Sequence, residues 1–89
     1  MEEKLLKIYN HFGEQSQIEK LREEVEELIE AIKEGDEEHI KEEMADVLVI
    51  VNQIVYKKEM NEGELVEIFE QKVNRTLERI ETKYYEQEE

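Results

Sequence analysis

The chain contains no cysteine, no proline and no tryptophan, and it has only three glycines among its 89 residues. Without cysteine, disulfide bridges and thiolate metal sites are both excluded. The lack of proline and the scarcity of glycine mean that little in the sequence interrupts a helix. No apolar run approaches the length of a membrane-spanning helix, and Met1-Glu2-Glu3 is unlike the start of a secretory signal. We therefore expect a cytoplasmic protein with no membrane partner.

Positive charge is also scarce, because 12 Lys and Arg residues stand against 26 Asp and Glu residues, for a formal net charge of −14. Nucleic acids and anionic membranes are bound through clustered basic side chains, so neither is an expected partner. The charged fraction of 43% and the hydrophobic fraction of 38% suit amphipathic helices that bury one stripe.

Apolar residues recur at helical spacing along four segments of the chain, and no stretch alternates as a strand would. The four segments cover about residues 2–12, 15 or 16 to 33, 37–58 and 61 or 62 to 85. These patterns predict an all-α fold, with a single helical domain over residues 1–86 and a disordered tail over residues 87–89.

Capping signals mark the ends of the first three segments. Gly13 and Gly35 are placed to end the first and second helices. Ser16 with Glu19 fits a capping box at the start of the second helix, and Asp36 fits the N-cap of the third.

The third segment is apolar almost all round at residues 47–51, whereas a surface helix normally shows one stripe. Val49 and Ile50 lie outside its main stripe and need a second cover, unless they are simply part exposed. The simplest cover is a second copy, so we predict a four-helix bundle completed by homo-oligomerisation. The main stripe, expected to face the core, consists of Met44, Val47, Leu48, Val51, Ile54 and Val55.

Two short acidic runs stand out on the second and third segments. They are Glu-Glu-x-x-Glu at Glu23, Glu24 and Glu27, and Glu-x-x-Asp at Glu43 and Asp46. Hard divalent cations such as Mg²⁺ prefer such oxygen ligands. The acids have similar angular offsets from the apolar stripes of the two helices. If the two helices are antiparallel neighbours, two arrangements are possible. Both sets of acids point into the groove between the helices, as in a metal site, or both point away from that groove as solvated acids.

Asp46 is the most informative of these acids. It is one of only two aspartates and lies inside an otherwise apolar helix, where aspartate is a poor helix former. Glu-Glu-x-x-Glu, in contrast, is expected about once by chance in a chain so rich in glutamate.

Basic and amide side chains supply further candidates. Lys72, Arg75 and Arg79 share one face of the fourth segment, where they could clamp a polyphosphate or pair with neighbouring acids. Three amides could contact a nucleobase, although ordinary polar surface positions are the simpler interpretation: Gln17, Asn52 and Gln53. His11 and His39 lack partners at ligand spacing and receive no role.

The acidic runs and their surroundings resemble the MazG-like family of all-α nucleoside triphosphate pyrophosphohydrolases. The resemblance rests on residues 21–32 and 42–48, which contain the two runs. The upstream His11-Phe12-Gly13 with Gln17, and the downstream Lys72-Val73-Asn74-Arg75 before Arg79, are similar to the compact members found in phages and Gram-positive bacteria.

The resemblance implies hydrolysis of a (d)NTP to a nucleoside monophosphate and pyrophosphate with Mg²⁺, or Mn²⁺ in its place, in clearing aberrant or excess nucleotides. It also implies a homodimer or homotetramer. By the match to the motif, the metal ligands would be Glu24, Glu27, Glu43 and Asp46. Glu23 and Glu24 would be catalytic, with Glu23 a further ligand or the group that orients water, and the phosphates would be held by Lys72, Arg75 and Arg79. The alternative is a non-enzymatic acidic helical protein that binds a basic partner, for example as a DNA mimic.

Overall fold

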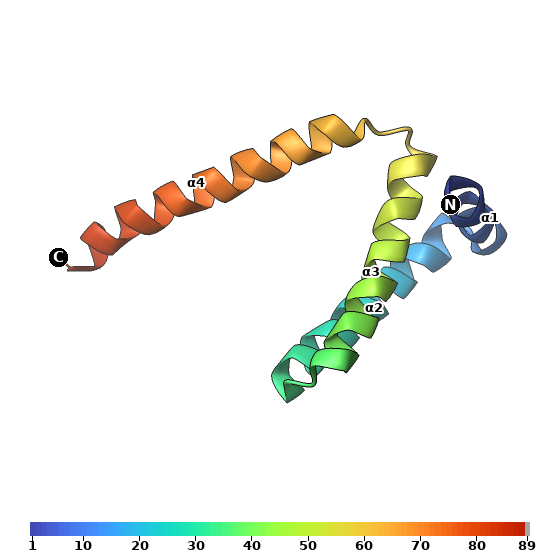
Figure 1. The fold of residues 1–89 in the computed structure, drawn as a ribbon, viewed down its shortest axis with the longest axis horizontal. Helices are drawn as coiled ribbons and strands as arrows, with labels where there is room; N and C mark the ends of the chain where they lie inside the picture. The colour runs from blue at the N-terminus through green and yellow to red at the C-terminus, as the bar shows by residue number, and fades with distance from the viewer. Residues whose placement is uncertain (89) are drawn as a thin grey trace. The chain divides into compact units, whose positions relative to one another are not determined.

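The computed structural model describes the backbone of residues 1–88 and the side chains of residues 1–82. It consists of four helices, and the described residues contain no strand, which confirms the predicted all-α fold (Figure 1). The helices are α1 (Glu2–Phe12), α2 (Glu14–Glu34), α3 (Glu37–Lys57) and α4 (Glu62–Glu88). The chain divides into two compact units, Met1–Glu59 with α1–α3 and Met60–Glu89 with α4. Among the described residues, no helix combines the length and apolarity needed to cross a membrane.

Glycine and aspartate set the helix ends in the first unit. Gly35 follows α2 in the left-handed conformation at φ 76°, which only glycine adopts without strain, and its N–H donates to the carbonyls of Ala31 and Ile32. Asp36 then accepts the N–H of His39 at 3.3 Å, which confirms the predicted N-cap of α3.

The capping box predicted at Ser16 and Glu19 is wrong. Gly13, at φ 89°, ends α1 and lets the chain turn at once, so α2 begins at Glu14 and Ser16 lies inside it. The predicted start of this helix, at residue 15 or 16, was therefore one or two residues late.

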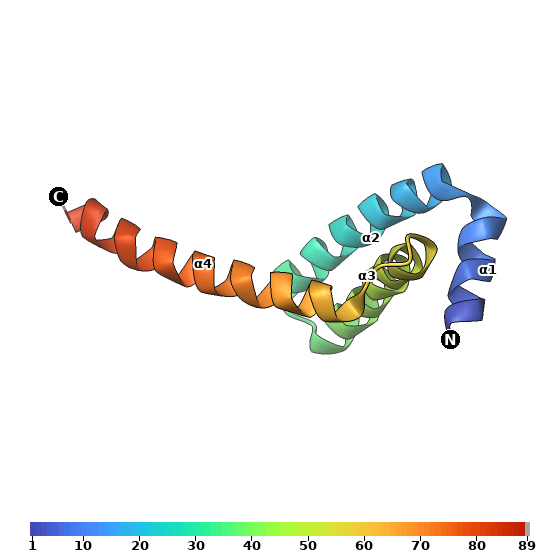
Figure 2. The ribbon, with the colours of Figure 1, turned by 90° about the horizontal axis from the view of Figure 1, so that it is seen from above.

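The first unit is built from α2 and α3, which lie antiparallel on either side of a short link, with α1 packed against both (Figures 1 and 2). Its interior is unusually polar. The buried apolar residues are Leu5, Tyr9, Ala31, Ile50 and Val55, and the buried polar ones are Gln17, Glu24, Glu43 and Gln53. Because buried carboxylates and amides need partners, this composition points to a functional cavity between the helices.

The face of α3 that turns inward differs from the predicted one. Ile50, expected to need an outside cover, is buried at 3% exposure. Of the stripe expected to face the core, Val55 is buried, Val47 and Ile54 are half-buried, and Met44, Leu48 and Val51 remain exposed. The physical reason is that α3 turns its acid-bearing side towards α2, and Ile50 lies between the directions of its two acids.

The same inversion holds for α2. The buried residues of α2 are spaced seven apart and lie on one face of the helix: Gln17, Glu24 and Ala31. The large apolar residues that recur along α2 at helical spacing are partly or largely exposed, and the more exposed of them are Ile18, Val25, Ile29 and Ile32. The first unit therefore buries two acids and two amides beside a few apolar residues, and it leaves apolar residues of α2 and α3 on its surface.

The second unit is the single amphipathic helix α4. Asn61 accepts the N–H of Glu64 at 3.1 Å through its side-chain oxygen, which caps the start of the helix. Glu89 lies outside the described residues, so the single domain over residues 1–86 and the tail over residues 87–89 stay predictions.

Candidate functional site

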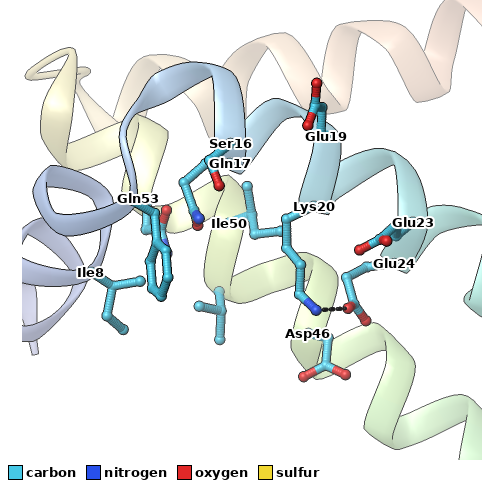
Figure 3. A pocket seen from close by; sticks show the side chains of 12 residues that line it. Ile8, Ser16, Gln17, Glu19, Lys20, Glu23, Glu24, Asp46, Ile50 and Gln53 are labelled. Carbon is cyan, nitrogen blue, oxygen red and sulfur yellow. Dashed lines mark ion pairs between the residues drawn. The ribbon is translucent and has the colours of Figure 1, made fainter.

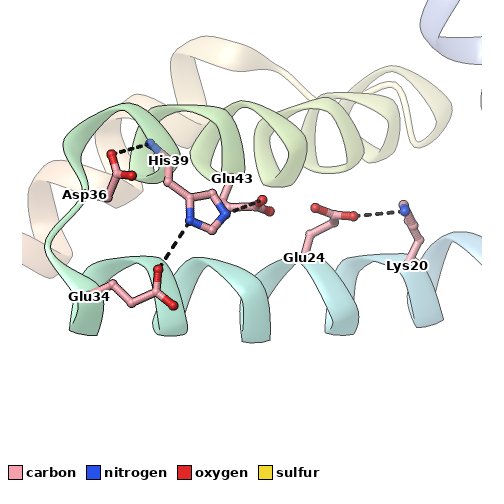
Figure 4. A network of polar contacts seen from close by, with 6 residues as sticks. All are labelled: Lys20, Glu24, Glu34, Asp36, His39 and Glu43. Carbon is pink, nitrogen blue, oxygen red and sulfur yellow. Dashed lines mark hydrogen bonds and ion pairs between the residues drawn. The ribbon is translucent and has the colours of Figure 1, made fainter.

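Three carboxylates from two helices converge in the first unit. Glu24 and Glu27 of α2 and Glu43 of α3 each offer an oxygen, and these oxygens lie within 4.8 Å of one another. Figure 4 shows Glu24 and Glu43 pointing into the space between α2 and α3. Glu24 and Glu43 are buried and Glu27 is exposed. Of the two arrangements that the sequence left open, the structure has the one in which the acids share a groove.

Burial leaves these acids in an electrostatic conflict. Desolvation raises the pKa of Glu43, and hydrogen bonding and charge repulsion from Glu27 and Glu24 raise it further. The Oε2 atoms of Glu24 and Glu43 are buried without a hydrogen-bond partner. Carboxylate oxygens of this kind, which repel one another and lack partners, are the ligands that hard divalent cations prefer. The residues present therefore fit Mg²⁺ or Mn²⁺.

Asp46 adds a fourth carboxylate next to this cluster. It lines a pocket together with Glu24 but is not among the three residues whose oxygens lie within 4.8 Å. Desolvation raises the pKa of Asp46, and its hydrogen bonding and repulsion with Glu24 act in the same direction. A cation bound at the cluster would favour its ionised form.

Lys20 is the cation that the structure itself supplies. Its Nζ lies 2.9 Å from Oε1 of Glu24, one helical turn away on α2. This hydrogen bond has the largest effect on the pKa of Glu24 and lowers it below the usual range, although desolvation alone would raise it. Sequence reasoning missed Lys20, although its i, i+4 spacing from Glu24 is a recognisable signal.

His39 holds Glu43 from the other side (Figure 4). Its Nε2 lies 3.3 Å from Oε1 of Glu43, and its Nδ1 lies 3.7 Å from Oε2 of Glu34. The imidazole therefore lies between Glu34, at the C-terminal end of α2, and Glu43 on α3, and it is close enough to Glu43 to orient that carboxylate. No role was predicted for His39 from the sequence, because it does not stand in an apparent set of metal ligands, whereas its actual partner Glu43 lies one helical turn further on.

A pocket of about 480 Å³ adjoins the carboxylates (Figure 3). Lys20, Glu24 and Asp46 lie towards one end of it, and Ile8 and Gln53 lie towards the other. Its full lining comprises Ile8, Phe12, Ser16, Gln17, Glu19, Lys20, Glu23, Glu24, Asp46, Val49, Ile50 and Gln53. One end is thus charged, and the other combines apolar side chains with amides.

The amide candidates from the sequence separate into two groups. Gln17 and Gln53 line the pocket and are buried. Asn52 is exposed, lies outside the pocket lining, and donates its side-chain N–H to the carbonyl of Leu48 at 2.9 Å. Of the three amides, Gln17 and Gln53 are therefore placed to reach a ligand in the pocket, and the nucleobase role of all three stays a prediction.

The basic candidates lie on α4, in the second unit. Lys72, Arg75 and Arg79 are all exposed there. Their assignment to phosphate binding stays a prediction, as does the role of Glu23, which lines the pocket next to Glu24.

An all-helical protein that gathers carboxylates from two antiparallel helices beside a pocket is suited to binding a cation and an anionic ligand. The chain matches the family model of the MazG nucleotide pyrophosphohydrolase domain over residues 12–83, and it belongs to this family. The resemblance noted in the sequence is thereby confirmed. No curated protein and no solved structure matches the chain.

Proposed function

We propose that this protein is a Mg²⁺-dependent hydrolase that converts a (d)NTP and water into a (d)NMP and pyrophosphate, and so clears aberrant or excess nucleotides. The bond broken is that between the α-phosphorus and the oxygen bridging to the β-phosphate, and the oxygen of water takes its place. The observation that carries the proposal is the carboxylate cluster of Glu24, Glu27 and Glu43 beside a pocket, in a chain of this family.

The acids divide the work in this proposal. Mg²⁺, or Mn²⁺ in its place, would be held by Glu24, Glu27, Glu43 and Asp46. When bound, the ion neutralises charge on phosphate oxygens and lowers the pKa of a coordinated water. Glu23, exposed in the pocket next to Glu24, would orient the attacking water and accept its proton.

Cationic side chains bind the triphosphate in the same proposal. Lys20 lies at the charged end of the pocket, where its ammonium group can donate to a phosphate oxygen as well as to Glu24. The match to the family motif adds Lys72, Arg75 and Arg79 as phosphate ligands.

The direct test is a pyrophosphate-release assay with each NTP and dNTP in the presence of Mg²⁺. We expect turnover of at least one nucleotide, equimolar monophosphate and pyrophosphate as products, and loss of turnover with excess EDTA. No release from any nucleotide by the purified protein, with Mg²⁺ or Mn²⁺, would show that the proposal is wrong.

His39 provides a prediction about metal binding. Replacing His39 by Ala removes the partner of Glu43 Oε1, so the carboxylate is no longer oriented. Partners of metal ligands typically contribute tenfold to a hundredfold in affinity, so we expect Mg²⁺ to bind about tenfold more weakly by calorimetry. Lys41→Ala is the control, because among the side chains that the structure describes Lys41 pairs only with the exposed Glu37 and Glu38. Equal affinity in the two variants would contradict the role of His39.

The raised pKa of Asp46 provides a prediction about pH. In metal-free protein the folded state keeps this proton to higher pH than the unfolded chain, so stability falls as pH rises through that window. Asp46→Asn removes the penalty. Its melting temperature should match that of wild type at about pH 3 and exceed it above the raised pKa. Saturating Mg²⁺ should reverse the order at neutral pH, whereas an unchanged order would contradict a metal role for Asp46.

The exposed apolar stripes of α2 and α3 lead us to propose that the protein self-associates. Ile29 and Ile32 on α2, and Met44 and Leu48 on α3, are each between 46% and 57% exposed. Contiguous apolar residues on a surface mark an interaction site, and a second copy of the chain carries a stripe of the same chemistry. We propose a homodimer or homotetramer.

A further inference from the structure

Gln53 is the most unusual side chain in the first unit. It is the largest fully buried side chain, with 0% exposure, and both its Nε2 and its Oε1 lack a hydrogen-bond partner. A buried amide normally satisfies both atoms, because an unpaired buried polar group opposes folding. An unsatisfied amide of this kind therefore suggests a partner that arrives with a ligand.

The surroundings of Gln53 indicate which ligand would bring that partner. It lines the pocket at the end away from Glu24 and Asp46, as Figure 3 shows. Gln17, exposed by only 6%, lines the same pocket on α2, so two amides from two helices belong to one cavity. If a nucleotide binds with its triphosphate at the charged end of the pocket, its base lies at the other end, next to the amides.

We infer that Gln53, assisted by Gln17, recognises the base of the bound nucleotide. The inference rests on the proposed function, since it requires a nucleotide as the ligand. A carboxamide presents one donor and one acceptor side by side, which is the complement of the adjacent acceptor and donor on the edge of a nucleobase. The pocket is consequently selective among bases, and not a general triphosphate site.

Phe12 supplies a base contact of a different kind. It lines the same pocket and is 57% exposed, so its ring is available to a ligand. Stacking of a base on an aromatic ring is tolerant of base identity, whereas hydrogen bonding to an amide is not. We expect Phe12→Ala to weaken the binding of all nucleotides to a similar extent, and Gln53→Met to change the preference among them.

The main test compares kcat/KM for the four nucleotides of one sugar in wild type, Gln53→Met and Gln15→Met. Gln15 is an exposed glutamine of α2 outside the pocket, so it controls for the same exchange of side chain. We expect the ratio between the best and worst base to exceed about tenfold in wild type and in Gln15→Met, and to approach one in Gln53→Met. Equal use of the four bases by wild type, or an unchanged ratio in Gln53→Met, would overturn the inference.

Stability gives an independent readout. Methionine has nearly the shape of glutamine but no groups to satisfy, so nucleotide-free Gln53→Met should melt higher than wild type by several degrees. A lower melting temperature than wild type would mean that the amide is satisfied in the free protein, for instance by a water, and would overturn the inference.

Binding measurements separate this inference from the proposed reaction. Thermal shifts of wild type with α,β-methylene triphosphates of the four bases need no hydrolysis. If the shifts depend on the base and Gln53→Met abolishes that dependence while no nucleotide is hydrolysed, the recognition of the base holds and the reaction fails.

As a check on unmodified protein, the side-chain amide signals of Gln53 in ¹⁵N spectra should shift on addition of the preferred analogue and those of Gln15 should not. Unmoved Gln53 signals at saturation would overturn the inference.

Discussion

Asp46→Asn and Glu24→Gln are each expected to lower kcat/KM for nucleotide hydrolysis by at least about a hundredfold. Each exchange keeps the shape of the side chain and replaces a carboxylate oxygen next to the pocket with an amide nitrogen. Neither should unfold the protein. The carboxylates repel one another, and loss of one negative charge relieves that repulsion for the groups that remain.

The control for this experiment is Glu26→Gln. Glu26 is an exposed residue of α2 that neither lines the pocket nor belongs to the carboxylate cluster, so its loss should leave kcat/KM within about twofold. Circular dichroism and melting temperature establish that all three variants are folded. If Asp46→Asn or Glu24→Gln retains wild-type turnover while folded, the assigned site is wrong. If all three lose turnover equally, the effect is one of overall charge.

The sequence was sufficient to predict four helices and to single out Glu24, Glu27 and Glu43, whose oxygens the structure brings together. Gly13, Gly35 and Asp36 mark helix ends because their backbone or side-chain chemistry is local, and local chemistry can be recognised without a fold. The convergence of Glu24 and Glu43 was one of two arrangements that the sequence allowed. Rotational offsets fix where the acids lie relative to the stripe of each helix, but they do not say which side of the helix faces its neighbour.

The burial pattern could not be predicted for the same reason. The assumption that the largest apolar stripe faces the core placed Leu48 and Val51 inside and Ile50 outside, and the structure has the reverse. Gln53 looked like a surface residue because glutamine is rarely buried. Its burial depends on α1 and α2 closing over α3, which is a tertiary property that no periodicity in α3 contains.

Ile29→Glu and Leu48→Glu, introduced singly, are expected to convert an oligomeric wild type into a monomer. Both residues lie on the exposed apolar stripes of the first unit, at 46% and 53% exposure. Burying such side chains against a second copy would stabilise the assembly by about 1.5–3 kcal/mol for each that becomes fully covered. A glutamate at either position would instead place an unpaired charge in an apolar interface, which raises the dissociation constant by about a hundredfold or more.

Sedimentation at several protein concentrations distinguishes the outcomes. Wild type should sediment as a dimer or tetramer, each variant should shift to monomer at micromolar concentration, and Gln15→Glu, which adds the same charge at an exposed polar position of α2, should behave as wild type. Because the pocket and the carboxylates lie within one copy of α1–α3, the monomers should still bind Mg²⁺. A monomeric wild type, or variants that remain oligomeric, would contradict an interface on these stripes. Monomers that lose Mg²⁺ binding would mean that a second copy completes the metal site.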